Sequence, residues 1–206
     1  QTRGYDGAGF YCVTSKGQSH QYKSEGMISD VFTSTVVNKY KDVKASMWLY
    51  ETRYGTAGAT KLANIQPIAA KHAEGGNFAV IHNGQFSDED GLSGGEISDT
   101  RIFVDQLAKS PQGTWDERIL SLQKQKRGAW SVVVSTPEGL FLMRDKFGIR
   151  PLAYGEKTDA ETGQKMWVAS SETAALKAMG MTEFFEILPD SVMKITAKGV
   201  KQLQAT

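Results

Sequence analysis

Residues 78–88 read "FAVIHNGQFSD", an apolar, strand-forming run that continues directly into a polar His-Asn-Gly trio. Two interpretations are open from this stretch alone. An Asn-Gly pair readily takes positive φ, so the trio is typical of a hairpin turn, and the segment by itself favours the turn. The same trio can instead direct an amide and a backbone N–H at a developing negative charge. The rest of the sequence has to decide.

Length and composition exclude several classes of protein. A chain of 206 residues predicts one domain, 1–206, that buries its core without disulfides or a structural metal. The net charge of +1 gives no electrostatic footprint for nucleic acid or an acidic membrane. A single cysteine, Cys12, excludes an internal disulfide framework, and three histidines are too few for a zinc site, so we expect no metal. No apolar run approaches the roughly 20 residues that span a bilayer, which favours a cytoplasmic protein.

The spacing of apolar residues predicts more strands than helices. Period-two or continuous apolar runs predict strands at 8–14, 20–26, 45–56, 78–83, 129–136, 140–145, 152–155 and 166–170, and a final strand pair at 184–188 and 191–196. Helical spacing covers 28–40, 98–110, 115–127 and 171–180, with Ser98 or Asp99 as the N-cap of the second helix. Because the helices are grouped rather than alternating with strands, the pattern favours an α+β fold over a doubly wound parallel sheet.

Six polar segments stand in an order that is more specific than any one of them. They read "RGYDGAGF" (3–10), "TRYGTAG" (52–58), "HNGQF" (82–86), "SDT" (98–100), "RDKFGIRPLAYG" (144–155) and "VASSETAAL" (168–176). Each alone is better explained as a cap, a turn or a salt bridge. In sequence they resemble the motifs of the class II glutamine amidotransferases, which are N-terminal nucleophile hydrolases. The resemblance implies a four-layer αββα sandwich with largely antiparallel sheets.

The resemblance also implies a role for each matching residue. Asn83, through its side-chain amide, and Gly84, through its backbone N–H, would form a catalytic oxyanion hole. Arg53 would bind the substrate α-carboxylate, Asp99 the α-ammonium, and Thr56 would add a hydrogen bond. The residues expected to support the surrounding strands and loops are Arg3, Asp6, His82, Arg144 and Arg150.

The nucleophile is a serious departure from the family pattern. In the family it is an N-terminal cysteine on a strand that precedes the RGYD segment, whereas this sequence begins at Gln1. Cys12 lies inside the apolar run 8–14, so we expect it to pack in the core. The cysteine-bearing strand can precede Gln1, belong to another chain, or be absent natively. We favour the first, because losing a central strand would leave buried backbone groups unpaired at about 1–3 kcal/mol each.

The leading hypothesis is a domain or subunit that hydrolyses L-glutamine to glutamate and ammonia through a cysteine thioester. It would be an enzyme if a nucleophilic cysteine precedes Gln1, would need no cofactor of its own, and would serve an ammonia-accepting synthase domain or subunit, most simply in a hetero-oligomer. The alternative is an inactive glutaminase-like subunit that scaffolds or regulates a glutamate-synthase-like complex, whose partner would carry flavin or iron–sulfur. A third hypothesis keeps the fold but changes the amide substrate; the pairing of Arg53 with Asp99 favours an amino acid.

Overall fold

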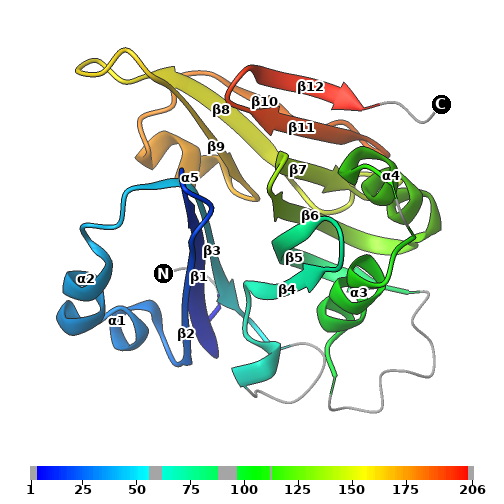
Figure 1. Cartoon of the computed structure of the whole chain (residues 1–206), viewed down its shortest axis with the longest axis horizontal. Coiled ribbons are helices and arrows are strands. Elements are labelled where there is room, and N and C mark those ends of the chain that lie inside the picture. Colours follow the sequence, from blue (N-terminus) through cyan, green and yellow to red (C-terminus); the bar gives the residue numbers. More distant parts are fainter. Residues whose placement is uncertain (1–3, 56–61, 88–96, 112, 204–206) are drawn as a thin grey trace. The chain divides into compact units, whose positions relative to one another are not determined.

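The computed structural model describes residues 4–55, 62–87, 97–111 and 113–203 (Figure 1). The chain divides into two compact units. The first contains residues 1–81 and 89–110, and the second contains residues 82–88 and 111–206. In the described part of the chain, no helix has the length and apolar character needed to cross a membrane.

The first unit is built on a three-stranded antiparallel sheet. Its order is β2 (Ser19–Glu25), β1 (Gly7–Thr14), β3 (Ala45–Arg53). These are the strands predicted at 20–26, 8–14 and 45–56. Phe10 of β1 anchors an aromatic cluster on one face, with its ring centroid 4.9–6.3 Å from those of Phe32, Tyr40, Trp48 and Tyr50. Such contacts between aromatic rings stabilise the fold beyond the effect of burying their apolar area.

The single helix predicted for 28–40 is wrong. The structure has two short helices, α1 (Ile28–Val31) and α2 (Ser34–Tyr40). The break occurs because Thr33 adopts an extended conformation and becomes an N-cap, its side chain accepting a hydrogen bond from the backbone N–H of Val36. A local side-chain bond thus overrides the continuous apolar spacing.

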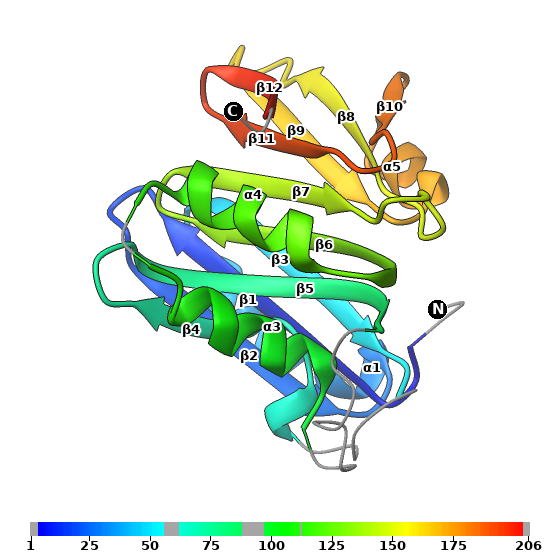
Figure 2. The same cartoon turned by 90° about the vertical axis from the view of Figure 1, so that its right-hand side faces the viewer.

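The other elements of the first unit follow β3. The short 3-10 helix η1 (Leu62–Asn64) leads into β4 (Ile68–His72), which pairs antiparallel with the first half of β5 (Gly76–Phe86). Sequence spacing did not predict β4. Helix α3 (Asp99–Ala108) lies along β4, as Figure 2 shows, and its buried side chains include Phe103, Val104 and Leu107.

The second unit contains two groups of strands. The first has the order β12 (Gly199–Leu203), β11 (Val192–Thr196), β7 (Gly139–Arg144), β6 (Gly128–Thr136), with the end of β5 next to β6. Helix α4 (Trp115–Gln125) lies along β6 and β7 (Figure 2) and begins with a capping box of Thr114 and Glu117. The second group is β10 (Phe184–Glu186), β8 (Ala153–Thr158) and β9 (Lys165–Ser170), accompanied by α5 (Thr173–Ala178).

The predicted pairing of 184–188 with 191–196 is wrong. β10 pairs with β8, whereas β11 pairs with β7 and β12. The turn between β10 and β11 is bound by two residues at the end of β7: Arg144 donates to the carbonyl of Ile187, and the N–H of Asp190 donates to the carbonyl of Asp145. These bonds hold the turn open, so the two strands enter different sheets.

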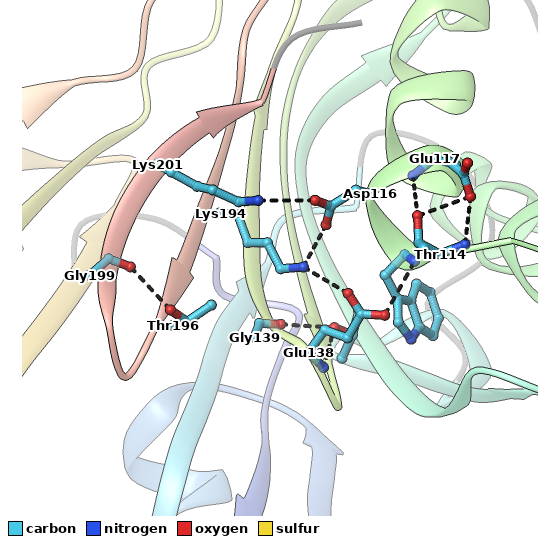
Figure 3. Close-up of polar contacts among 11 residues, drawn as sticks. Thr114, Asp116, Glu117, Glu138, Gly139, Lys194, Thr196, Gly199 and Lys201 are labelled. Carbon is cyan, nitrogen blue, oxygen red and sulfur yellow. Dashed lines mark hydrogen bonds and ion pairs between the residues drawn. The ribbon is translucent and has the colours of Figure 1, made fainter. Parts of the chain in front are cut away.

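An ion-pair cluster fixes the start of α4 to the sheet of its own unit (Figure 3). Lys194 of β11 is 7% exposed, and its Nζ lies 2.5 Å from an oxygen of Asp116 and 2.7 Å from one of Glu138. Lys201 of β12 reaches the other oxygen of Asp116 at 3.3 Å. Burial would raise the pKa of Asp116, but its lysine partners outweigh burial and hold that pKa below the usual range.

Candidate functional site

The His-Asn-Gly trio lies inside β5 and is no hairpin turn. The strand continues from Gly76 to Phe86. Gly84 has φ +129°, and a Cβ there would lie 2.1 Å from the carbonyl oxygen of Ala129 and 2.7 Å from the Cα of Trp130. Both clashes are with the backbone of β6, which no rotamer change can relieve. The glycine is therefore required by the close approach of two strands.

Asn83 presents a buried amide that the described residues leave without a hydrogen-bond partner. Its Nδ2 is shielded from solvent and donates to none of them. An unpaired buried donor typically costs about 1–3 kcal/mol, so it calls for an explanation. His82 is 5% exposed and its ring stacks on Phe86 at 4.4 Å between centroids. Strand alternation directs Asn83 to the opposite face, so the amide is not part of that packing.

A fully buried carboxylate stabilises β6 at the point where Gly84 meets it. Asp145 is 0% exposed and accepts hydrogen bonds from the backbone N–H groups of Trp130, Phe147, Ile149 and Arg150 at 2.9–3.3 Å. Its own N–H donates to the carbonyl of Trp130 at 3.0 Å. Burial would raise the pKa of Asp145, but the four donors outweigh burial and hold the pKa below its ordinary value.

Arg144 holds the loop that follows β7. Its buried guanidinium donates to the carbonyls of Arg150 at 2.9 Å and Gly148 at 2.7 Å, and pairs with Glu186 at 2.7 Å. Arg150 contributes its main chain to this arrangement, while the residue as a whole is exposed. The two arginines therefore differ: one supports the loop with its side chain, the other with its backbone.

Arg53 lies at the end of β3 in the first unit, within the field of two carboxylates. It is 7% exposed, and its Nη1 donates to the carbonyl of Asn64 at 2.9 Å. Burial lowers the pKa of Arg53, while the charges of Asp6 and Asp99 act to raise it. A guanidinium remains charged in proteins. The structure thus brings Arg53 and Asp99 together in one unit, with opposite charges.

Asp99 is the first residue of α3, and Ser98 is the N-cap. Ser98 Oγ accepts from the N–H of Arg101 at 3.3 Å, so of the two predicted N-cap candidates it is Ser98 that caps the helix. One oxygen of Asp99 accepts from the N–H of Thr100 at 2.8 Å, and the residue is half-buried. Asp6 stabilises the end of β3, because its carboxylate accepts from the N–H of Gly55 at 2.7 Å.

A comparison with protein families identifies the chain. The family described as "Glutamine amidotransferase domain" matches residues 57–178, more than half of the sequence. The chain belongs to this family. The predicted membership of the class II glutamine amidotransferases is thereby confirmed.

Relatives and solved structures agree with this assignment. A chloroplastic amidophosphoribosyltransferase of Vigna aconitifolia is 32% identical over 212 residues, covering 98% of this chain and 41% of the relative. A glutamine phosphoribosylpyrophosphate amidotransferase of B. subtilis has a TM-score of 0.79 and 27% identity over 97% of this chain and 43% of its own. A structure described as the allosteric regulatory enzyme of purine biosynthesis has a TM-score of 0.81 and 26% identity, covering 97% of this chain and 43% of its own. The predicted α+β fold of the N-terminal nucleophile hydrolase type is confirmed, and the chain spans about two fifths of the length of these relatives.

Arg3 and Thr56 lie outside the described residues. Cys12 is 0% exposed in the middle of β1, and burial raises the pKa of its thiol. A buried thiol with a raised pKa is a poor nucleophile, so Cys12 packs in the core as expected.

Sequence reasoning missed Asn64 and Gln66 of the amidotransferase domain. Both are buried, at 2% and 7% exposure, in the segment that leads from η1 to β4. Asn64 contacts Arg53 and the residue before Asp99. No sequence pattern marks either amide as functional, because an isolated polar residue in "ANIQPI" is equally compatible with an ordinary loop.

Proposed function

We propose that this amidotransferase domain hydrolyses L-glutamine to L-glutamate and ammonia, and that the ammonia is used by a synthase domain of the same polypeptide. The observation that carries the proposal is the buried Nδ2 of Asn83, for which the described residues offer no acceptor. A donor fixed before charge develops stabilises a transition state more than a ground state. The unpaired amide thus has the property that an oxyanion hole requires.

Arg53 and Asp99 would recognise the amino-acid end of glutamine. The planar guanidinium suits a carboxylate, since it can donate two parallel hydrogen bonds. The half-buried carboxylate of Asp99 suits an ammonium. Because a peptide-bonded glutamine lacks at least one of these charged groups, the pair selects the free amino acid. Thr56 would add a hydrogen bond.

The reaction would proceed through a thioester. A cysteine sulfur attacks the carbon of the γ-carboxamide, and the carbonyl oxygen becomes an oxyanion that Asn83 Nδ2 and the N–H of Gly84 stabilise. The carbon–nitrogen bond then breaks, and nitrogen leaves as ammonia after taking a proton from the base. Water cleaves the thioester, which gives glutamate and restores the thiol. Since Cys12 is buried in β1, we place the nucleophile, with its α-amino group as base, on a cysteine outside residues 1–206.

The relatives support a phosphoribosyl acceptor for the ammonia. They are amidophosphoribosyltransferases, and the solved B. subtilis protein is a glutamine phosphoribosylpyrophosphate amidotransferase. The domain covers 41% of the first of these relatives, which leaves room in a protein of that kind for a synthase domain. We therefore propose phosphoribosyl pyrophosphate as acceptor and a fused synthase domain instead of a separate subunit.

The experiment compares two acidic positions on α3 in the full-length protein. Asp99→Asn removes the proposed ammonium partner, whereas Asp105→Asn removes a carboxylate that is 47% exposed and pairs with Arg101 on the same helix. Losing a hydrogen bond to a charged group, at about 1.5–3 kcal/mol, predicts a fall of about 10- to 150-fold in kcat/KM for Asp99→Asn. The control should stay within about twofold of wild type. Equal effects of the two substitutions would contradict the assignment of Asp99, and absence of glutamate formation by wild type would contradict the proposed function.

A further inference from the structure

Residues 64–67 cross one face of the β2-β1-β3 sheet. In the antiparallel register Gly7 is opposite Arg53, and Gly9 is opposite Lys23. Directly opposite residues of an antiparallel pair share a face, so both cations project from the face on which these glycines leave room. A Cβ at Gly7 would lie 2.8 Å from the Ile65 side chain, and one at Gly9 would lie 2.5 Å from the carbonyl oxygen of Gln66. The segment therefore rests directly on β1.

Side chains from β2 and β3 hold the main chain of this segment. Arg53 Nη1 donates to the carbonyl of Asn64 at 2.9 Å, Lys23 Nζ to that of Ile65 at 2.8 Å, and Gln21 Nε2 to that of Pro67 at 2.6 Å. Burial lowers the pKa of Lys23, and the nearby charge of Arg101 lowers it further. Three donors on three carbonyls fix the position of the segment on the sheet.

The same segment holds the start of α3 on both sides of Asp99. Asn64 Oδ1 accepts from the N–H of Ser98 at 3.2 Å, and Gln66 Nε2 donates to Thr100 Oγ1 at 3.3 Å. All four residues are buried, at 1–7% exposure. Asp99 lies between the two bonded residues, so its backbone position is set by residues 64–67.

We propose that residues 64–67 set the separation of Arg53 and Asp99, and that Asn64 and Gln66 are positioning residues for recognition of the amino-acid end of glutamine. The inference rests on the proposed function. Asn64 is the central residue, because its carbonyl accepts a hydrogen bond from the Arg53 guanidinium and its side-chain oxygen accepts one from the N–H of Ser98. A single residue thus connects the cation that binds the α-carboxylate with the helix that carries the anion for the α-ammonium.

Position matters here because two charged groups must fit one small molecule. A displacement of about 1 Å in a positioning contact can lower the rate about 100-fold. Removal of the Asn64 side chain leaves its carbonyl, and hence the contact with Arg53, in place. It removes the acceptor for the N–H of Ser98, so the start of α3 is expected to shift relative to Arg53. Loss of the Gln66 amide acts on the other side of Asp99, through Thr100.

The test measures substrate preference in the full-length protein. The two substrates are L-glutamine and glutaramate, which has hydrogen in place of the α-amino group. The quantity is the ratio of their kcat/KM values for wild type, Asn64→Ala, Gln66→Met and the control Gln106→Met, an exposed amide on α3. A variant that merely folds less well loses active enzyme for both substrates equally, which leaves the ratio unchanged. Misplacement of Asp99 affects glutamine alone.

We expect Asn64→Ala to lower the ratio by about tenfold or more, mainly through KM for glutamine, and Gln66→Met to lower it in the same direction. The control should keep the wild-type ratio. If Asn64→Ala does not fold, Gln66→Met decides. An unchanged ratio in the folded variants, with wild type hydrolysing and preferring glutamine, overturns this inference alone. A wild type that shows no hydrolysis, or no preference for glutamine over glutaramate, overturns the proposed function and this inference with it.

Discussion

Replacement of Asn83 by leucine should separate catalysis from stability. The Nδ2 group of Asn83 is buried and finds no acceptor among the residues that the structure describes. In Asn83→Leu an apolar side chain of similar volume takes the place of a polar one. If the amide serves the reaction alone, the substitution removes an unpaired buried donor, which favours stability. It also removes a hydrogen-bond donor to the oxyanion, which lowers the rate.

The substitution is expected to leave stability unchanged or raised while it lowers kcat. Burying an unpaired donor costs about 1–3 kcal/mol, and imperfect packing of leucine offsets part of that gain. We therefore expect the free energy of unfolding to stay level or rise by about 1 kcal/mol, which corresponds to about 2–4 °C in Tm for a chain of this size. Loss of one oxyanion donor lowers kcat about 100- to 1000-fold, or about 3 kcal/mol.

The assay combines thermal unfolding with glutamate release by the full-length protein. The matched control is Asn77→Leu, which changes an exposed amide on the same strand; it should leave kcat near wild type. The reasoning is refuted if Asn83→Leu lowers Tm by several degrees, because the amide would then have a structural partner. It is equally refuted if the variant keeps wild-type kcat.

Three further predictions concern packing and charges within the second unit. Gly84→Ala places a Cβ 2.1 Å from the carbonyl oxygen of Ala129 and should destabilise the fold by about 2 kcal/mol or more; an unchanged Tm would contradict the close approach of the strands. The pKa of Asp145 lies below its ordinary value, so its charge stabilises the fold above about pH 4 and loses effect as pH falls through the folded-state pKa. Urea unfolding at neutral and acid pH should therefore show the difference between wild type and Asp145→Asn shrinking in acid, and a constant difference would argue against it. Lys194 has a raised pKa and Asp116 a lowered one, so Lys194→Met should cost most between about pH 4 and pH 10. Its cost there should be about 1–2 kcal/mol, because Glu138, a further partner of the lysine, is 42% exposed and solvent screens that pair; a loss that does not vary with pH would contradict the ion pairs.

Sequence patterns predicted those helices and strands that are determined by residues close together in the sequence. The apolar runs over 129–136 and 140–145 predicted β6 and β7 because both strands lie in the core, where most of their consecutive residues are buried. The break at Thr33 escaped prediction because a one-residue cap competed with a longer apolar stripe. The sheet assignment of β10 and β11 depends on Arg144, whose partner Ile187 is 43 residues away, and no local pattern contains that contact.

The residues of the candidate site likewise divide into those that a sequence motif contains and those that depend on distant contacts. Ordered motifs singled out Arg53, Asn83 and Asp99 as candidates, because their residue types and order resemble those of a family. Asn64 was missed because its partners lie 11 and 34 residues away in the sequence. The Asn-Gly pair suggested a turn because glycine permits positive φ, but at position 84 glycine is needed for the approach of Ala129.

The most direct measurement is a crystal structure of the full-length protein with L-glutamate, the proposed product. We predict the α-carboxylate within hydrogen-bond distance of the Arg53 guanidinium and the α-ammonium at the carboxylate of Asp99. Glutamate bound without contact to Arg53 or Asp99 would contradict the account.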